Sequence, residues 1–139
     1  MKPLPMKVPR SENGFQCKPR IRIVQGKTIA LGPGKVDLLE AVDRVGSISQ
    51  AARLMKLSYR RAWDMIHMIN QNFKTPLVAR VAGGKGGGGA YLTEEGKSVV
   101  CLYRKMEQGA LVAMQTQWND LQKLLREPDL EDSDPNEKL

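Results

Sequence analysis

Apolar residues recur every three or four positions in four segments of the chain and alternate with polar residues in short runs between them. The first spacing is that of an amphipathic helix, and the second is that of a half-buried strand. The expected helices cover residues 35–45, 48–55, 59–73 and 94–126, and the expected strands cover residues 20–24, 28–31, 77–81 and 90–93. This order predicts an α+β fold, mainly helical, with one hairpin before the first helix and another before the last.

Residues that favour helix ends stand at the borders of these segments. Three hydroxyl side chains precede helical runs and are expected to cap them: Ser47, Ser58 and Thr93. Gln50, three residues after Ser47, completes a capping-box pattern. Gly46 is placed to end the first helix, and Pro76 prevents the third helix from continuing.

The second and third helices are separated by a short turn at Lys56 and Leu57. Small residues stand where two crossing helices would touch, namely Ala51, Ala52 and Ala62. This arrangement predicts a helix-turn-helix, in which the second helix of the pair enters the major groove of DNA. Lys56 occupies a turn position where glycine is common, so we expect some backbone strain there.

The third helix has two chemically different faces. Ala62, Met65, Ile66 and Ile69 share the apolar one, and Tyr59, Arg60, Trp63, Asp64 and His67 share the opposite one. The second face is polar, cationic and aromatic, as a groove-reading surface should be. Trp63 lies on the outer face by its spacing, although tryptophan is more often partly buried, and both placements stay open.

Arg60 and Arg61 lie in the first turn of this helix, the end expected to meet base edges. One guanidinium can bind guanine O6 and N7 while its neighbour binds a phosphate. The alternative for both arginines is an ordinary solvated helix face. The expected contacts are completed by Ser47, Ser49, Ser58, Tyr59, Trp63, Asp64 and His67, the last being a surface or phosphate contact rather than a catalyst.

The glycine-rich segment 83–89 lies between the last two expected strands. A phosphate-binding loop of a nucleotide hydrolase would need Ser or Thr after Lys85, Gly at position 79 and a following helix, and none of these is present. The segment fits the wing of a helix-turn-helix domain, with Arg80 and Lys85 placed to contact the DNA backbone. Disorder of this loop in the free protein is compatible with that role.

Charge is distributed unevenly over the 139 residues, whose net charge is +7. Residues 21–126 carry sixteen Lys/Arg against eight Asp/Glu, whereas residues 127–139 carry one Lys against six Asp/Glu. A basic body favours a polyanionic partner. We therefore divide the chain into an irregular basic lead-in (1–19), a DNA-binding domain (20–126) and an acidic, disordered tail (127–139).

The remaining composition excludes several classes of protein. Cys17, Cys101 and the single His67 are too few for a zinc site or a disulfide framework, and no acid, base and nucleophile set suggests an enzyme. There is no apolar run long enough to cross a membrane and no signal peptide pattern, so we expect a cytoplasmic protein.

The last expected helix is longer than a domain of this size needs to cover its core. Its three-four apolar pattern comprises Val99, Tyr103, Met106, Ala110, Ala113, Leu121 and Leu124. This pattern predicts a packing face that also pairs with a second copy, giving a homodimer. Two reading helices would then lie about 34–36 Å apart, or a multiple of that distance.

Five stretches carry a family resemblance: Gly-Ser-Ile-Ser-Gln-Ala-Ala (46–52), Ser-Tyr-Arg-Arg-Ala-Trp (58–63), Pro-Leu-Val (76–78), Gly-Gly-Lys-Gly-Gly-Gly-Gly-Ala (83–90) and Leu-Thr-Glu-Glu-Gly (92–96). They resemble the N-terminal DNA-binding domain of the molybdate-responsive ModE regulators and, more distantly, the winged helix-turn-helix of LysR-type regulators. The resemblance implies a dimeric bacterial transcription factor that reads operator DNA with residues 58–67. The C-terminal molybdate-binding domains of that family have no room in the acidic tail, so we expect no molybdate sensing and no cofactor.

The leading hypothesis is therefore a sequence-specific, double-stranded DNA-binding transcriptional regulator. A non-specific architectural DNA binder is one alternative, and its affinity would follow salt but not sequence. A protein-interaction module whose basic face binds an acidic partner is another, and it would require that the protein not bind DNA at low salt.

Overall fold

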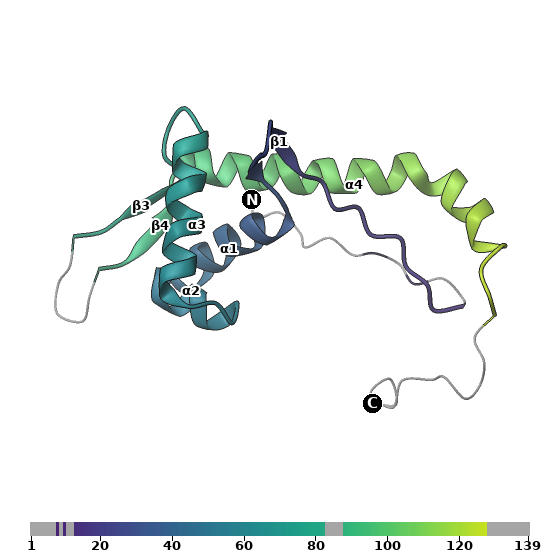
Figure 1. The fold of residues 1–139 in the computed structure, drawn as a ribbon, viewed down its shortest axis with the longest axis horizontal. Helices are drawn as coiled ribbons and strands as arrows, with labels where there is room; N and C mark the ends of the chain where they lie inside the picture. Colours follow the sequence, from purple (N-terminus) through teal and green to yellow (C-terminus); the bar gives the residue numbers. More distant parts are fainter. Residues whose placement is uncertain (1–7, 9, 11–12, 83–87, 128–139) are drawn as a thin grey trace.

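The computed structural model describes residues 8, 10, 13–82 and 88–127. Within these residues the elements follow the order β1 (Ile23–Gln25), β2 (Thr28–Leu31), α1 (Pro33–Val45), α2 (Ile48–Leu54), α3 (Tyr59–Asn72), β3 (Val78–Arg80), β4 (Ala90–Leu92) and α4 (Glu94–Gln122). Helix α4 is a long rod, with α1, α2 and α3 gathered at its N-terminal half and the β3–β4 hairpin projecting from that end (Figure 1). The mainly helical fold with two hairpins is confirmed.

The core lies where α1 meets the other elements. Helix α1 contacts α2, α3, α4 and β4. Its buried apolar residues are Val36, Leu38, Leu39, Ala41 and Val42, which pack with Ala51, Ala52, Ala62, Ile66 and Ile69 of the helix-turn-helix. The face of α3 that periodicity assigned to the core is therefore buried as expected, with Met65 only half-buried.

The predicted capping residues are confirmed by hydrogen bonds, although α1 begins at Pro33 rather than at residue 35 and α4 ends at Gln122 rather than at residue 126. The hydroxyl oxygens of Ser47, Ser58 and Thr93 each accept a bond of 3.1 Å from the backbone N–H three residues later. Gly46 ends α1 in the left-handed region (φ +70°), and its N–H donates to Val42 O at 2.8 Å. Gly46 O also accepts a bond from Ala90 N at 3.0 Å, so the end of α1 is joined to the wing.

Both hairpins are antiparallel, as predicted. The first is shorter than expected, because β1 begins at Ile23 and an irregularity in the register separates Ile23 from Val24. The second pairs Val78 with Leu92 and Arg80 with Ala90. Of the expected wing loop, residues 83–87, including Lys85, lie outside the described residues, as does the acidic tail beyond residue 127.

The backbone of Leu77 is the point at which the second hairpin meets α4. Its carbonyl accepts a hydrogen bond from Thr93 N at 2.9 Å and a second from Thr93 Oγ1 at 3.3 Å. Gly96, in the first turn of α4, lies against this carbonyl so closely that a Cβ there would be 2.2 Å from Leu77 O. Only glycine allows α4 to approach the hairpin this closely.

A buried charge cluster, which the sequence pattern did not indicate, fastens α4 to α1. Arg104 donates to Glu107 Oε1 and to Asp37 Oδ1, each at 2.7 Å, and to Glu40 Oε1. Glu107 is 1% exposed. Burial works against the charged guanidinium, but the hydrogen bonds that it donates to the three carboxylates outweigh this effect and raise the pKa of Arg104.

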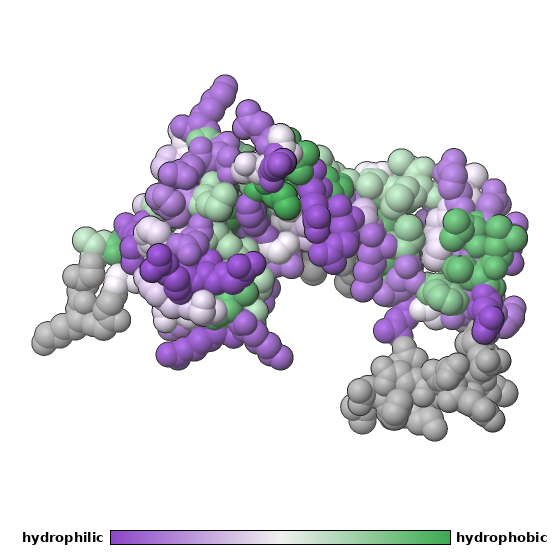
Figure 2. Space-filling view, in the orientation of Figure 1, coloured by the Kyte–Doolittle hydropathy of each residue, from purple (hydrophilic) through white to green (hydrophobic). Residues whose placement is uncertain are grey.

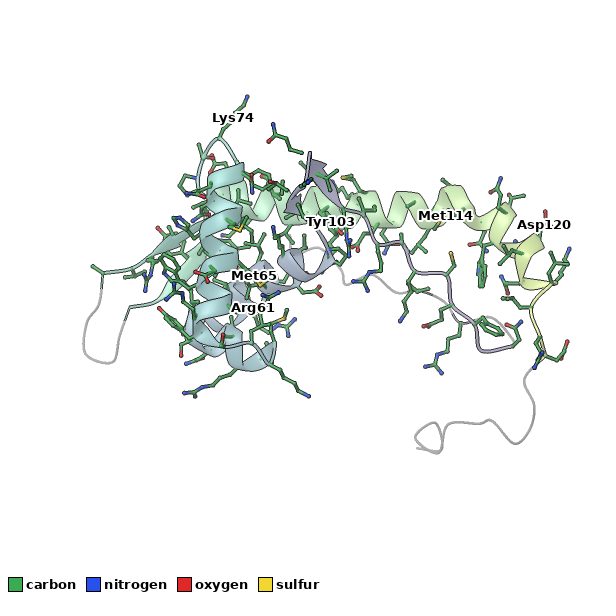
Figure 3. The ribbon with its side chains drawn as sticks, in the orientation of Figure 1. Arg61, Met65, Lys74, Tyr103, Met114 and Asp120 are labelled. Atoms are coloured by element: carbon green, nitrogen blue, oxygen red, sulfur yellow. The ribbon has the colours of Figure 1, made fainter. Side chains whose placement is uncertain are left out.

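The predicted apolar stripe of α4 is only partly correct. Tyr103 is buried, and its hydroxyl donates to Ile21 O at 2.6 Å, so the helix is covered there by the extended segment before β1 (Figure 3). The buried line continues through Val100, Arg104 and Glu107 rather than through Met106. Met106 is exposed because it lies on the solvent side of the buried part of α4, whereas Ala113, Leu121 and Leu124 lie beyond the body of the domain, where no helix or strand of the described residues covers them (Figure 1).

None of the helices in the described part of the chain combines the length and apolar character needed to span a bilayer.

Gly96 and Gly109 form a matched pair on α4. We expect Gly96→Ala to destabilise the protein by about 2 kcal/mol or more, because backbone must move away from the new methyl group. A Cβ at Gly109 meets nothing within 4 Å. Gly109→Ala should therefore stabilise the protein by about 0.5–1 kcal/mol. Urea unfolding of both variants measures the difference, and equal effects would contradict the close approach at Leu77.

Arg104→Met should cost about 3–5 kcal/mol, because Glu107 would be left buried without its cation. The double variant Arg104→Met, Glu107→Leu should recover most of that loss. Lys105→Met, at the exposed neighbouring position, should change stability by no more than about 0.5 kcal/mol. Failure of the second substitution to restore stability would contradict this account of the cluster.

Candidate nucleic-acid interface

Helix α3 presents its polar face to solvent. Every residue that spacing placed on this face is exposed: Tyr59, Arg60, Trp63, Asp64 and His67. Arg61 is exposed as well, and Figure 3 shows it near the start of α3, one turn before Met65. Hydrophilic side chains cover much of the surface over α2 and α3 (Figure 2).

The start of α3 combines the capping residue Ser58 with two exposed arginine side chains, Arg60 and Arg61. Ser58 holds the helix start by accepting from Arg61 N, which leaves both arginine side chains unconstrained by the cap. Arg60 Nε lies 3.4 Å from Asp64 Oδ2, with 87% of the arginine side chain and 52% of the aspartate side chain exposed. An exposed pair of this kind is weak, so the guanidinium can leave it for a stronger acceptor at little cost.

Trp63 lies on the outer face of α3 and is also partly buried, so both expected placements hold in part. Its indole is 36% exposed. The imidazole of His67, one turn further along α3, stacks on it with ring centroids 5.1 Å apart and planes inclined by 7°. The imidazole therefore covers part of one face of the indole, and the two rings form a small aromatic stack on the helix.

Two serines of the expected contact set belong to α2 and its cap. Ser47 is half-buried and its oxygen is used in capping, while Ser49 is fully exposed in the first turn of α2. Both lie at the beginning of a helix, where backbone N–H groups and the helix dipole favour anions.

The turn between α2 and α3 contains the expected strained residue. Lys56 has φ +57° and is the non-glycine residue with positive φ in the described ranges 13–82 and 88–127. Leu57 N donates to Ala52 O at 2.8 Å and closes the turn. The left-handed conformation at Lys56 therefore sets the direction in which α3 leaves α2.

Strand β3 contacts α3 directly. Arg80 Nη2 donates to the hydroxyl of Tyr59 at 3.4 Å. Arg80 is exposed at the end of β3, where the chain turns into the glycine-rich loop. Two of the predicted site residues from separate segments are thus brought together, whereas the placement of Lys85 lies outside the described residues.

Two residues that the sequence reasoning did not select also shape this surface. Lys35, from α1, lines a hollow with Arg60, Arg61, Asp64 and Met65. Its Nζ donates to Ile29 O, and burial lowers the pKa of Lys35. No periodic signal marks this residue, because α1 and α3 come together only in the fold.

Asn70 is the second such residue and connects α3 to the hairpin. Its Oδ1 accepts from Leu77 N at 2.9 Å and from Val78 N at 3.1 Å, and its Nδ2 donates to Val78 O at 3.1 Å. One side chain therefore fixes the start of β3 relative to the end of α3. The sequence gives no clue beyond a polar residue next to the buried Ile69.

A family model described as bacterial regulatory helix-turn-helix protein, lysR family, matches residues 34–97. This range begins in α1 and ends in the first turn of α4. Residues 34–97 are therefore similar to the helix-turn-helix domain of LysR-type regulators.

Curated relatives extend the similarity. The molybdenum transport protein ModE of Azotobacter vinelandii is 44% identical over 95 residues, which are 66% of this chain and 35% of that protein. The DNA-binding transcriptional dual regulator ModE of Escherichia coli K12 is 45% identical over 76 residues, 55% of this chain and 29% of that protein. The chain thus spans about a third of the length of the relatives it matches.

A third relative is the molybdenum-pterin-binding protein MopB of Rhodobacter capsulatus, 44% identical over 79 residues, which are 57% of this chain and 29% of that protein. The similarity to ModE that the sequence motifs indicated is confirmed for the helix-turn-helix segment.

Asn70 and Asn72 provide a matched test of the link between α3 and the hairpin. Asn70→Ala should destabilise the protein by about 2 kcal/mol, because two backbone N–H groups and one carbonyl lose their partner. Asn72 is exposed and its side chain donates to Met68 O at 2.9 Å, within its own helix. Asn72→Ala should cost no more than about 0.5 kcal/mol. Thermal unfolding compares them, and a similar loss for both would argue against the clamp.

Proposed function

We propose that the protein is a sequence-specific transcriptional regulator that binds double-stranded DNA with α3 in the major groove. The observation that carries the proposal is the outward face of α3, which is cationic and aromatic and belongs to a LysR-type helix-turn-helix domain. An α-helix fits the major groove, and its N-terminal residues reach the base edges.

Arg60 and Arg61 are the residues we assign to direct contact in the first turn of α3. A guanidinium can donate two parallel hydrogen bonds to guanine O6 and N7. Arg60 would exchange its weak contact with Asp64 for such an acceptor, and the freed carboxylate can accept from cytosine N4.

The start of α2 and the wing are assigned to the DNA backbone. Ser47, Ser49 and Ser58 have hydroxyl hydrogens that can be donated to phosphates, since the capping bonds of Ser47 and Ser58 use only their oxygens. Arg80 and Lys85 supply charge from the wing, and glycines around Lys85 let the main chain approach a phosphate closely. These contacts position the domain and carry no sequence information of their own.

Dimerisation through α4 is the oligomeric arrangement we favour. Large apolar side chains remain exposed on this helix: Leu102, Met106, Val112, Leu121 and Leu124. Pairing with the α4 of a second copy would cover part of this surface. A symmetric dimer would read two half-sites one DNA turn apart, or a multiple of it.

A cytoplasmic location and the absence of catalysis follow from the proposed role rather than from a separate observation. Molybdenum is named in two of the relatives, but the matches cover only 35% and 29% of those proteins. The described residues contain no group of three His, Cys, Asp or Glu side chains that could hold a metal ion. We assign no cofactor to this segment.

In-vitro selection of bound duplexes at two salt concentrations tests the proposal. A shared motif should emerge at both, whereas a non-specific architectural binder would yield duplexes without one. Failure to bind any duplex at low salt would favour an interaction module with an acidic protein partner instead.

On the selected duplex, Arg60→Ala should cost about 1–3 kcal/mol at one base position and relax specificity there. Lys85→Ala should weaken binding to all sequences alike and lower the slope of log K against log salt by about one. Fluorescence anisotropy titrations on single-base variants measure both. Uniform weakening by both substitutions would refute base reading by Arg60.

A further inference from the structure

We infer that the stacked pair Trp63 and His67 reads the C5-methyl group of thymine in the major groove, so that thymine content sets part of the specificity. The inference rests on the proposed DNA binding by α3 and assigns one chemical feature of the target to one surface of the protein. The aromatic side chain of Trp63 stays partly exposed to solvent in the fold.

An exposed indole needs explanation on a face that is otherwise charged. The apolar side of α3 already supplies the core through Ala62, Ile66 and Ile69, and Trp63 is not used there. Trp63 instead remains 36% exposed, stacked against His67 on the face that also carries Arg60 and Asp64. Removing this apolar area from water would be favourable in a complex.

The pair is held in a fixed plane before any partner arrives. Residues four apart on a helix lie on the same face, which brings the imidazole over the indole at 5.1 Å. The rings are inclined by 7° and stack face on face, so the edge of the stack is a stiff aromatic surface with few rotatable bonds. A surface of this kind loses little side-chain freedom when it meets a flat ligand.

The major groove offers one apolar group. Guanine, cytosine and adenine show hydrogen-bond donors and acceptors there, and thymine alone adds a methyl group. Trp63 is in the second turn of α3, immediately after the turn that carries Arg60 and Arg61. When the arginines reach base edges, the aromatic pair lies over the neighbouring base pairs, and the thymine methyl is the group it can cover.

His67 acts through the indole as a positioning residue. Its ring covers part of the indole and opposes rotation of that side chain away from the helix. This role needs a flat ring at position 67. His67→Phe should therefore keep most of the discrimination between thymine and uracil, whereas His67→Ala should lose it.

The test replaces thymine by deoxyuridine, one position at a time, in the tightest duplex from the selection. Uracil keeps the pairing and the O4 acceptor, so only the methyl group is lost. The wild-type chain should bind about fourfold more weakly when the contacted thymine is replaced, the ratio expected for losing burial of one methyl group. Trp63→Ala should bind both duplexes equally, while Trp63→Phe should keep part of the ratio.

Met68→Ala is the matched control, because Met68 is an exposed apolar residue of α3 that lies on the side of the hollow rather than in the aromatic pair. It should retain the wild-type thymine-to-uracil ratio. His67→Ala should reduce the ratio and His67→Phe should restore it. Circular dichroism melting of each variant establishes that the fold is kept.

Two results overturn the inference while leaving the proposed function intact: tight, sequence-specific binding that is insensitive to every thymine-to-uracil replacement, or a ratio that Trp63→Ala leaves unchanged. The contacted thymine can also be replaced by cytosine and then by 5-methylcytosine. Tighter binding of the 5-methylcytosine duplex than of the cytosine duplex would support methyl recognition. Absence of binding to every duplex would instead overturn the proposed function on which the inference depends.

Discussion

The arrangement of the candidate interface depends on the backbone of Leu77. Its N–H is bound by the side chain of Asn70 at the end of α3, and its carbonyl is bound by Thr93 at the start of α4. Gly96 packs on the same carbonyl without room for a Cβ. Three elements therefore meet at the backbone of one residue. Because each contact is short and made to main-chain atoms, the position of the hairpin relative to α3 is fixed by geometry rather than by the size of a side chain.

That junction allows one rigid body to carry both proposed DNA contacts. Arg80, at the end of β3, donates a hydrogen bond to Tyr59 of α3, so the hairpin and the helix are joined at this point. At the other side of the hairpin, Gly46 ends α1 and accepts a bond from Ala90 at the start of β4. The hairpin is thus held at both strands, each by an element of the helical core. A phosphate contact at the wing would consequently fix the depth at which α3 enters the groove.

Helix α4 has two parts with different partners. Its N-terminal part is buried against α1 and fastened by Arg104, whose carboxylate partners come from both helices. Its C-terminal part extends beyond the domain and exposes apolar side chains such as Val112 and Leu124, at 77% and 86%. The charge cluster orients the helix, since a guanidinium with three carboxylate partners is satisfied in one register only. The direction in which the exposed part points is then set by the core.

The sequence by itself determined the elements, their ends and the two faces of α3. Caps at Ser47, Ser58 and Thr93, the left-handed end at Gly46 and the spacing of Ala62, Ile66 and Ile69 act over four residues or fewer, so they are readable without the fold. Only the tertiary structure decided that Trp63 stays in solvent, that Asn70 clamps the hairpin and that the buried line of α4 passes through Arg104 and Glu107 instead of Met106. Each of the last two depends on partners elsewhere in the chain, up to 67 residues away for Arg104, and periodicity carries no information about such partners.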